Sequence, residues 1–463
     1  MNYLIKDTIA AVVTPAGRSA IGVVKLSGPK ATHIAKKIFF LPSNKTLKEL
    51  ISHHLYFGKI IYRGQLIDEA VLSIMLAPHS HTGEDVVEFS LHGNPLILEK
   101  MLSVCTALGA RAALGGEFSF RAYLNGKMDL TKAEAVCELI KSQTAFAAQA
   151  ALTRLGGALG EKINQLRQII LDIASHAEAA LDHPEEGIEF LDKTKTRKTL
   201  GELINTTLNI ADTAKSGIAL SQGIKITLIG RPNVGKSSLL NILLKRERAI
   251  VTNIAGTTRD TIAETVEVGG FPVTFTDTAG VRAKTTSKVE KIGQARALEE
   301  AKTAHIVLWL IDSSRTTNQD DKKIKDILYK LKAREKTLVL LNKSDLSQKA
   351  AGVKKLIGEL PSLNISAKTG KGISELEKKI LKLAGVSNAY NQEGLLVNER
   401  QKNGLLKCAK ELHLACTALQ KMPEEIVAMH LRCALSCLDK LTTGNSSTQD
   451  ILDNIFSKFC IGK

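Results

Sequence analysis

The sequence predicts a multidomain protein. An α+β domain comes first, and an all-α helical domain follows that is split by an inserted α/β domain. Three observations lead to this fold class: short β-like runs at the start, helical stretches on both sides of the insertion, and a strand–loop–helix alternation between them. The 463 residues are also long for one hydrophobic core. We place the parts at residues 1–119, 120–222, 223–385 and 386–463.

The first 119 residues alternate short β-like runs with two helical ones. Apolar residues recur within four runs that read as strands, over residues 21–28, 54–62, 69–78 and 85–93. Helical patterns cover residues 28–39 and 94–109. This mixture predicts a compact α+β domain.

Long amphipathic helices are predicted before and after the inserted domain. No proline occurs between Pro95 and Pro184, and apolar residues recur there at helical spacing. Beyond residue 386 apolar residues again recur at helical spacing, with Leu405, Leu412 and Leu419 on one face of the predicted helix. The simplest organisation is one helical domain whose halves flank the insertion. Two separate helical domains are the alternative.

The composition is that of a globular protein in a reducing compartment. It is 44% hydrophobic and 24% charged, and no apolar run reaches the roughly 18 residues that a membrane span needs. The N-terminus lacks the pattern of a signal peptide. The seven cysteines form no tight framework. We therefore expect a cytoplasmic protein without a membrane partner.

The net charge of +16, from 63 basic and 47 acidic residues, favours a polyanionic partner. Nucleic acid is the first candidate and an anionic membrane surface the second. A merely basic, solvated surface is the alternative.

A phosphate-binding loop is predicted at residues 230–237, where GRPNVGKS fits the pattern G-x-x-x-x-G-K-[ST]. The loop follows the strand-like run IKITLI and precedes the helix-like run SLLNILLKR, which is the context that the motif requires. The glycines let backbone N–H groups surround phosphates, and the helix N-terminus adds its positive dipole end. Lys236 is expected to reach the β- and γ-phosphates, and Ser237 to bind Mg²⁺.

Three further motifs complete a GTPase domain. In DTAG (277–280), Asp277 can join the Mg²⁺ shell and the Gly280 N–H can meet the γ-phosphate. In NKSD (342–345), the Asp345 carboxylate can accept from the ring N–H and the exocyclic amine of guanine, a donor pair that adenine lacks. In SAK (366–368), the Ala367 N–H can complete the base pocket. These motifs resemble the translation-factor-like class of GTPases and select GTP over ATP.

The groups that would activate the attacking water are less evident. In GTTRD, Thr257 and Thr258 are candidates for a threonine that reaches Mg²⁺. Val281 stands where Ras-like proteins carry the glutamine that orients water. Asn233 offers a carbonyl that can hold a monovalent cation near the phosphates. Glu290 can orient water, although by spacing alone a solvated helical carboxylate is the commoner interpretation.

The chain resembles the tRNA uridine-modification GTPase family (MnmE, also called TrmE) from end to end. The matching stretches are DTIAAVVTPAGRSAIGVVKLSG, TGEDVVEFSLHG, GGEFSFRAYLNGKMDLTKAEAV, GRPNVGKSSLLN, IAGTTRD and the ending FCIGK. The resemblance implies a potassium-activated GTP hydrolase. With an FAD-dependent partner subunit (MnmG, also called GidA), it would add an aminomethyl or carboxymethylaminomethyl group to the wobble uridine of certain tRNAs. The carbon would come from a tetrahydrofolate derivative held by a folate-binding-like N-terminal domain. A homodimer and a heterotetramer with the partner are implied.

The resemblance also implies the site residues. The K⁺ ligands would be Asn233, Thr252, Ile254 and Thr257, the Mg²⁺ ligands Ser237 and Thr258, and the folate contacts Lys25, Glu88, Lys127 and Lys463. The catalytic residues would be Glu290, which positions water, and Cys460. The complete GTP site would be Asn233, Val234, Gly235, Lys236, Ser237, Ser238, Thr252, Thr257, Thr258, Asp277, Thr278, Ala279, Gly280, Asn342, Lys343, Asp345, Ser366, Ala367 and Lys368.

Two positions depart from the family pattern. Lys25 stands where arginine is common, so a point charge replaces a bidentate fork. Gly115 stands where proline is usual.

The C-terminal run STQDILDNIFSKFCIGK predicts a short docked helix with an apolar stripe of Ile451, Ile455 and Phe459. Cys460 would lie near the C-terminal end of this helix, which disfavours a thiolate, so the residues alone favour a buried, inert cysteine. The resemblance instead implies that Cys460 takes part in the modification chemistry.

Two other classes of function remain open at this point. A GTPase switch in ribosome assembly would share the nucleotide motifs but not the first 120 residues or FCIGK. A scaffold with a vestigial GTP site is disfavoured because the phosphate and base motifs are intact.

Overall fold

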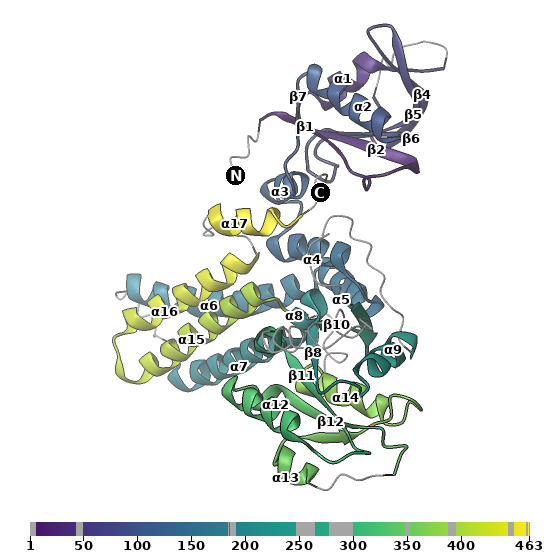
Figure 1. Cartoon of the computed structure of the whole chain (residues 1–463). Helices are drawn as coiled ribbons and strands as arrows, with labels where there is room; N and C mark the ends of the chain where they lie inside the picture. The colour runs from purple at the N-terminus through teal and green to yellow at the C-terminus, as the bar shows by residue number, and fades with distance from the viewer. Residues whose placement is uncertain are drawn as a thin grey trace. The chain divides into compact units, whose positions relative to one another are not determined.

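The structure is a computed structural model that describes residues 6–42, 50–183, 185, 191–246, 264–276, 300–347, 352–387, 395–442, 449–459 and 462 (Figure 1). It contains two compact units. The first comprises residues 1–137, 160–165 and 435–463, and the second residues 138–159 and 166–434. Three helices cross this division: α4 (Leu130–Lys141), α6 (Ala158–Asp182) and α16 (Glu424–Thr442). The predicted boundaries at residues 119, 222 and 385 stay predictions.

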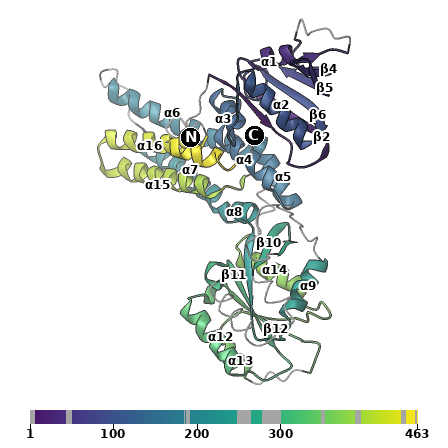
Figure 2. The same cartoon turned by 45° about the horizontal axis from the view of Figure 1, so that its top comes forward.

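The first unit is built on a seven-stranded sheet with the order β3-β4-β5-β6-β2-β1-β7. The strands are β1 (Thr8–Val12), β2 (Ser19–Ser27), β3 (Phe39–Phe40), β4 (His54–Tyr62), β5 (Gln65–Met75), β6 (Val86–Gly93) and β7 (Ala110–Ala112). Helices α1 (Ala31–Ile38) and α2 (Pro95–Ala107) pack on it (Figure 2). The four predicted strands and both predicted helices are confirmed, whereas β1, β3 and β7 were not predicted.

One face of this sheet is buried under the two helices. Burial alternates along β2 and β6, as expected for a sheet with one covered face. Ile34 of α1 and Met101 of α2 belong to the same apolar cluster as Val24 and Phe89 of the strands, and all four are fully buried. Asn94 starts α2 by accepting a hydrogen bond from the Leu96 N–H, with Pro95 in the first turn.

A buried charge network fixes the first strand to helix α3 (Glu117–Leu124). The Arg121 side chain is 2% exposed and forms ion pairs with Asp7 (2.5 Å), Glu84 (3.2 Å) and Glu117 (3.2 Å). Arg111 pairs with Asp7 at 2.7 Å and with Glu117 at 2.6 Å. Buried charges need partners on every side, so this network specifies how the N-terminus, α3 and the loop before β6 fit together.

The C-terminal segment docks on α3 within the same unit. Helix α17 (Gln449–Phe456) brings Phe456 to 5.2 Å from Phe120, ring centre to ring centre, and Ile455 and Phe459 are also buried. Gly116 has φ 75°, and a Cβ there would lie 2.3 Å from the Phe456 carbonyl oxygen. Only glycine therefore permits this approach. A docked C-terminal helix was predicted and is confirmed; the side chain of Ile451 lies outside the described residues.

The second unit contains helices and a six-stranded sheet with the order β13-β12-β11-β8-β10-β9. The strands are β8 (Ile224–Ile229), β9 (Glu264–Val268), β10 (Phe271–Thr276), β11 (Ile306–Asp312), β12 (Thr337–Asn342) and β13 (Ser362–Asn364). All neighbours pair in parallel except β9, which is antiparallel to β10. The strand-like run IKITLI that was predicted to precede the phosphate-binding loop is confirmed as β8, and β9 was not predicted.

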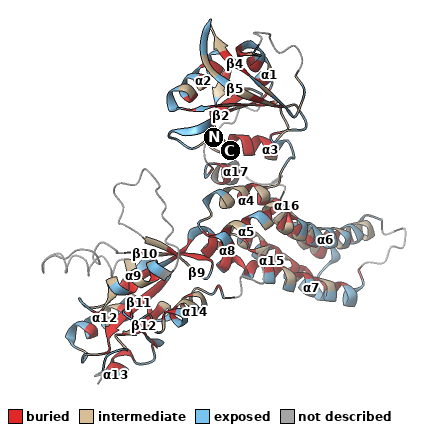
Figure 3. Cartoon of the chain, turned by 90° about the vertical axis from the view of Figure 1, so that its right-hand side faces the viewer, coloured by how far each residue is buried: buried red, intermediate tan, exposed pale blue. Residues whose placement is uncertain are grey.

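Helices cover both faces of this sheet, as the strand–helix alternation predicted. They are α9 (Lys236–Arg246), α12 (Gln319–Lys330), α13 (Val353–Ile357) and α14 (Ile373–Leu383), with a short 3₁₀ helix at Arg334–Lys336. Strand β11 is buried along its whole length (Figure 3). Its Leu308 and Leu310 join one apolar cluster with α9 and α14, whereas Trp309 and Ile311 join another with α12 and α13.

Helices from before and after the α/β domain pack together in the second unit. The helical elements here are α5 (Ala145–Leu155), α7 (Lys193–Asp212), α8 (Ala214–Gln222) and α15 (Glu399–Lys421), and α7 lies along α15. The buried Thr213 hydroxyl donates to the Leu395 carbonyl at 2.7 Å and accepts from the Val397 N–H at 3.2 Å. A Cβ on Gly217 would lie 2.3 Å from the Val397 oxygen. These contacts confirm that the α/β domain is inserted into one helical domain. None of the described helices is long and apolar enough to cross a membrane.

The charge network predicts an acid-sensitive first unit. Burial raises the pKa of Asp7, but hydrogen bonds from Arg111 and Arg121 outweigh it and leave the pKa below the ordinary 3.8. Stability from this group is therefore fully present above pH 3.8 and is lost as the pH falls through the lowered pKa. We expect Asp7→Asn to reduce the free energy of unfolding by about 1.5 to 3 kcal/mol at pH 7. The deficit should shrink towards pH 3.

The measurement is urea unfolding of the full chain and of Asp7→Asn at each pH. The exposed Asp326→Asn is the matched control and should show no deficit. A deficit for Asp7→Asn that is the same at pH 7 and pH 3 would contradict the assignment.

Candidate functional sites

The predicted phosphate-binding loop connects the carboxyl end of β8 to the first residue of α9. Gly230 has φ 151°, Asn233 has φ 58° and Gly235 has φ 101°, so three residues of the loop have a positive φ. The Lys236 ammonium donates to the carbonyl oxygens of Gly230 (2.8 Å) and Arg231 (2.9 Å), which draws the loop around its own lysine. A loop that is closed in this way and leads into a helix N-terminus presents backbone N–H groups to an anion.

An ion pair attaches the same loop to α12. The Arg231 Nε lies 2.9 Å from the Oδ1 of Asp321, whose side chain is fully buried. Asp321 also forms the capping box that starts α12, together with Asn318. Burial raises the pKa of Asp321, while the Asn318 N–H and Arg231 act in the opposite direction. Asp321 was not predicted as a site residue, because its position in the sequence is that of an ordinary first-turn acid.

Asn342, at the end of β12, joins the phosphate loop to the predicted base-binding loop. Its Nδ2 donates to the Val234 carbonyl at 2.7 Å, and its Oδ1 accepts from the Ala367 N–H at 2.9 Å. The residue is 2% exposed, and a Cβ on Gly235 would lie 2.2 Å from its Nδ2. One amide thus brings together three of the sequence motifs, NKSD, SAK and GRPNVGKS.

The base-recognition residues lie around this amide. A hydrogen bond with Ser366 lowers the pKa of Asp345 below its usual range, which keeps the carboxylate ionised as a guanine acceptor. Lys343, with φ 64°, places its ammonium 2.6 Å from the Asp312 Oδ2. Asp312 was missed in the sequence analysis, although it ends the strand-like run HIVLWLID at the carboxyl edge of the sheet.

Many of the predicted GTP and metal residues lie outside the described residues. The structure describes Asn233 to Ser238, Asn342, Lys343, Asp345 and Ser366 to Lys368, and it places them around one end of the sheet. Those outside are Thr252, Ile254, Thr257, Thr258, Asp277, Thr278, Ala279, Gly280 and Glu290, and with them Val281.

Two of the predicted folate residues meet on the N-terminal sheet. Lys25 of β2 and Glu88 of β6 are cross-strand partners, and the Lys25 Nζ lies 3.3 Å from the Glu88 Oε1. The Lys25 ammonium also lies 5.3 Å from the centre of the Phe118 ring. The Lys25 and Glu88 side chains are 12% and 30% exposed, so both remain accessible at the surface of the sheet. Phe118 was missed because an aromatic residue in a helical run reads as core.

Lys127 and the chain terminus approach the same strands. A Cβ on Gly83 would lie 3.2 Å from the Lys127 Cε, which places Lys127 over the loop that leads into β6. A Cβ on Gly462 would lie 2.8 Å from Val13, two residues beyond the partner of Lys25 on β1. Cys460 and Lys463 lie outside the described residues.

Family models match most of the chain. The model described as "MnmE helical domain" matches residues 130–460, and the model described as "GTP-binding protein TrmE N-terminus" matches residues 8–127. Two full-length relatives carry the name "tRNA modification GTPase MnmE". The protein of Clostridioides difficile is 41% identical over 99% of this chain and 100% of its own length. The protein of Aquifex aeolicus is also 41% identical, with the same coverage. The chain belongs to the MnmE family of tRNA modification GTPases.

Among solved structures, that of Era from Aquifex aeolicus bound to GDP·AlF₄⁻ matches 34% of this chain and 56% of that chain. The two are 29% identical with a TM-score of 0.27, a likeness too loose to carry an argument.

We predict that Asn342 holds the nucleotide site of this MnmE-family chain together. Asn342→Ala leaves the Val234 carbonyl and the Ala367 N–H without their partner, and each such loss costs about 1 to 3 kcal/mol. We expect GTP affinity to fall at least about tenfold. Isothermal calorimetry of GTP binding measures this. The exposed Asn364→Ala, on the neighbouring β13, is the matched control. Unchanged affinity in Asn342→Ala would disprove the coupling.

Proposed function

We propose that this chain is a potassium-activated GTP hydrolase that modifies the wobble uridine of certain tRNAs together with an FAD-dependent partner subunit (MnmG, also called GidA). The added group is aminomethyl or carboxymethylaminomethyl, and its carbon comes from a tetrahydrofolate derivative. The chain works in the cytoplasm as a homodimer and, with the partner, as a heterotetramer. Membership of the MnmE family supports the GTPase and tRNA parts of this proposal. The Lys25–Glu88 pair supports the folate part, and the left-handed Asn233 in the phosphate loop supports the potassium part.

The observation that carries the GTP reaction is the Asn342 bridge, because it holds a phosphate loop and a guanine pocket at fixed separation. Lys236 would neutralise phosphate charge, and Asp345 would select guanine. Ser237 and Thr258 would hold Mg²⁺, which would neutralise the charge that develops on the phosphates during hydrolysis. The left-handed Asn233 would hold K⁺ with Thr252, Ile254 and Thr257, and Glu290 would orient the attacking water.

The residues on the N-terminal sheet fit a reduced folate. The Glu88 carboxylate, with the Lys25 ammonium beside it, can accept from pterin N–H groups, while Lys127 can balance a carboxylate of the folate tail. When bound, the folate supplies a one-carbon unit. The docked C-terminal segment would bring Lys463 to the folate and Cys460 to the reacting carbon, because Gly462 lies beside Val13, the residue that follows β1. Lys25 lies over Phe118, so a lysine can serve here through position and charge alone.

Potassium dependence tests the cation proposal. A K⁺ ion held by Asn233 would neutralise phosphate charge in place of an arginine finger, which accelerates hydrolysis by about 10³ to 10⁵. We therefore expect hydrolysis in KCl to exceed that in NaCl by at least about tenfold. Asn233→Gly tolerates φ 58° but removes the side-chain carbonyl, and should abolish the difference. Asn233→Asp keeps an oxygen and should retain part of it. Equal rates in both salts for the unaltered chain would refute potassium activation.

Folate binding tests the modification chemistry. We expect a reduced folate to bind the full-length chain, and to bind at least about tenfold more weakly when residues 460–463 are deleted. Cys460→Ser, which keeps the terminus, should bind folate normally but fail to support tRNA modification. Calorimetry and an assay of modified uridine measure the two effects. If the intact chain binds no folate, a GTPase switch in ribosome assembly becomes the better hypothesis.

A further inference from the structure

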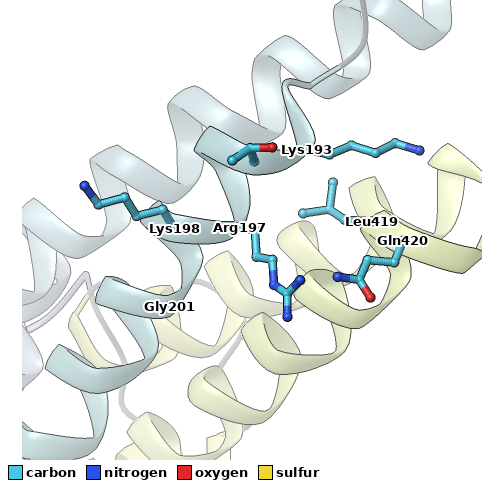
Figure 4. A pocket seen from close by; sticks show the side chains of 7 residues that line it. Lys193, Arg197, Lys198, Gly201, Leu419 and Gln420 are labelled. Atoms are coloured by element: carbon cyan, nitrogen blue, oxygen red, sulfur yellow. The ribbon is translucent and has the colours of Figure 1, made fainter.

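A basic pocket lies between α7 and α15 in the helical part of the second unit. It is a cavity of about 450 Å³ lined by Lys193, Thr194, Arg197, Lys198 and Gly201 of α7, and by Leu419 and Gln420 of α15. We call it the α7 pocket. In Figure 4, Arg197 extends from α7 toward α15, where Gln420 lies beside the opening. None of its seven lining residues belongs to the nucleotide or folate residues described above.

The charge of the pocket is not balanced within the described part of the chain. Lys193, Arg197 and Lys198 are exposed, and none of them forms an ion pair with a described residue. Lys195 adds a fourth exposed cation within six residues. Lys193 and Lys195 lie in the first turn of α7, where the positive end of the helix dipole repels cations. The N-cap Asp192, which accepts from the Thr194 and Lys195 N–H groups, is the one acid among the described residues at this end of the helix, so four cations leave a local positive charge that an anionic partner would compensate.

Gly201 is a second indication that the pocket holds a ligand. It lies within the 20-residue helix α7, where glycine costs roughly 1 kcal/mol relative to alanine. No packing contact explains it, because a Cβ at this position would meet nothing within 4 Å. Gly201 lines the pocket, so the missing side chain keeps the cavity open. Glycine at this position therefore lowers helix stability but leaves open space beside Lys193, Arg197 and Lys198.

We propose that the α7 pocket binds the phosphate backbone of tRNA. Lys193 and Arg197 are one turn apart, about 6 Å along the helix, so they can contact neighbouring phosphates of one strand. Thr194 and Gln420 add neutral donors for phosphate or ribose oxygens. None of the seven lining residues is aromatic, so the pocket offers no platform for base stacking. It therefore positions the tRNA without reading its sequence.

This inference rests on the proposed function, because it takes tRNA as the polyanion. It is tested by equilibrium binding of an unmodified tRNA transcript to the full-length chain over a range of KCl concentrations. Neutralising the pocket with Lys193→Gln, Arg197→Gln and Lys198→Gln together should weaken binding at least about tenfold and reduce the salt slope by about 2 to 3. GTP hydrolysis should be unchanged.

Two controls separate the pocket from net charge and from folding. Lys330→Gln, Lys354→Gln and Lys355→Gln together remove three exposed cations from α12 and α13, and should leave tRNA affinity within about twofold. Gly201→Leu fills the cavity without changing the net charge, and leucine has a higher helix propensity than glycine. It should weaken tRNA binding about threefold or more while the protein becomes no less stable.

Several results would overturn the proposal. One is equal weakening by both triple variants, which would mean that only net charge matters. Another is unchanged tRNA affinity in the triple variant of the pocket. If that variant keeps its tRNA affinity but loses binding to phosphatidylglycerol vesicles, the pocket binds an anionic membrane surface and the proposal is wrong. The binding assay contains no GTP, folate or partner subunit. Its failure is therefore distinguishable from failure of the proposed function, which the potassium and folate measurements report.

Discussion

The insertion of one domain into another depends on a buried hydroxyl. Thr213 stands where the chain leaves the first half of the helical domain, and it hydrogen-bonds to the backbone at Leu395 and Val397, where the chain returns. Gly217 lets the returning backbone approach to within contact distance. Because the two crossings are fixed side by side, α7 and α15 can pair along their length as though the α/β domain were a single long loop. The α7 pocket, which needs both helices, exists only because of this closure.

Inside the α/β domain, Asn342 likewise joins two segments that are distant in sequence. The phosphate loop follows β8 and the base-binding loop follows β13, and neither strand pairs directly with the other in the sheet. A side-chain amide can donate to one loop and accept from the other at the same time, which no apolar residue and no carboxylate can do. Recognition of the phosphates and of the base is thereby made one event, and the Arg231–Asp321 pair extends the same rigidity to α12.

Much of this could be predicted because the signals are local. The four motifs of the GTP site, the strands that precede them and the amphipathic helices are each contained within a few residues, where periodicity and spacing determine the structure. Strands β1, β3, β7 and β9 escaped prediction because they are short and gain their stability from neighbours across the sheet. Asp312, Asp321 and Phe118 escaped for a related reason. Their roles come from partners that are distant in sequence, and nothing in their immediate surroundings distinguishes them from ordinary strand, cap or core residues.

The docking of α17 on α3 also has a consequence for biosynthesis. Translation produces α3 before the second unit and α17 after it. Until α17 leaves the ribosome, Phe120 and the backbone at Gly116 have no partner in Phe456, so the nascent chain carries an unfinished apolar surface while the second unit is made. The unit that is begun first is completed only after the second unit has been synthesised. Premature termination anywhere upstream of α17 would therefore leave a product with an open core for the quality-control machinery to recognise.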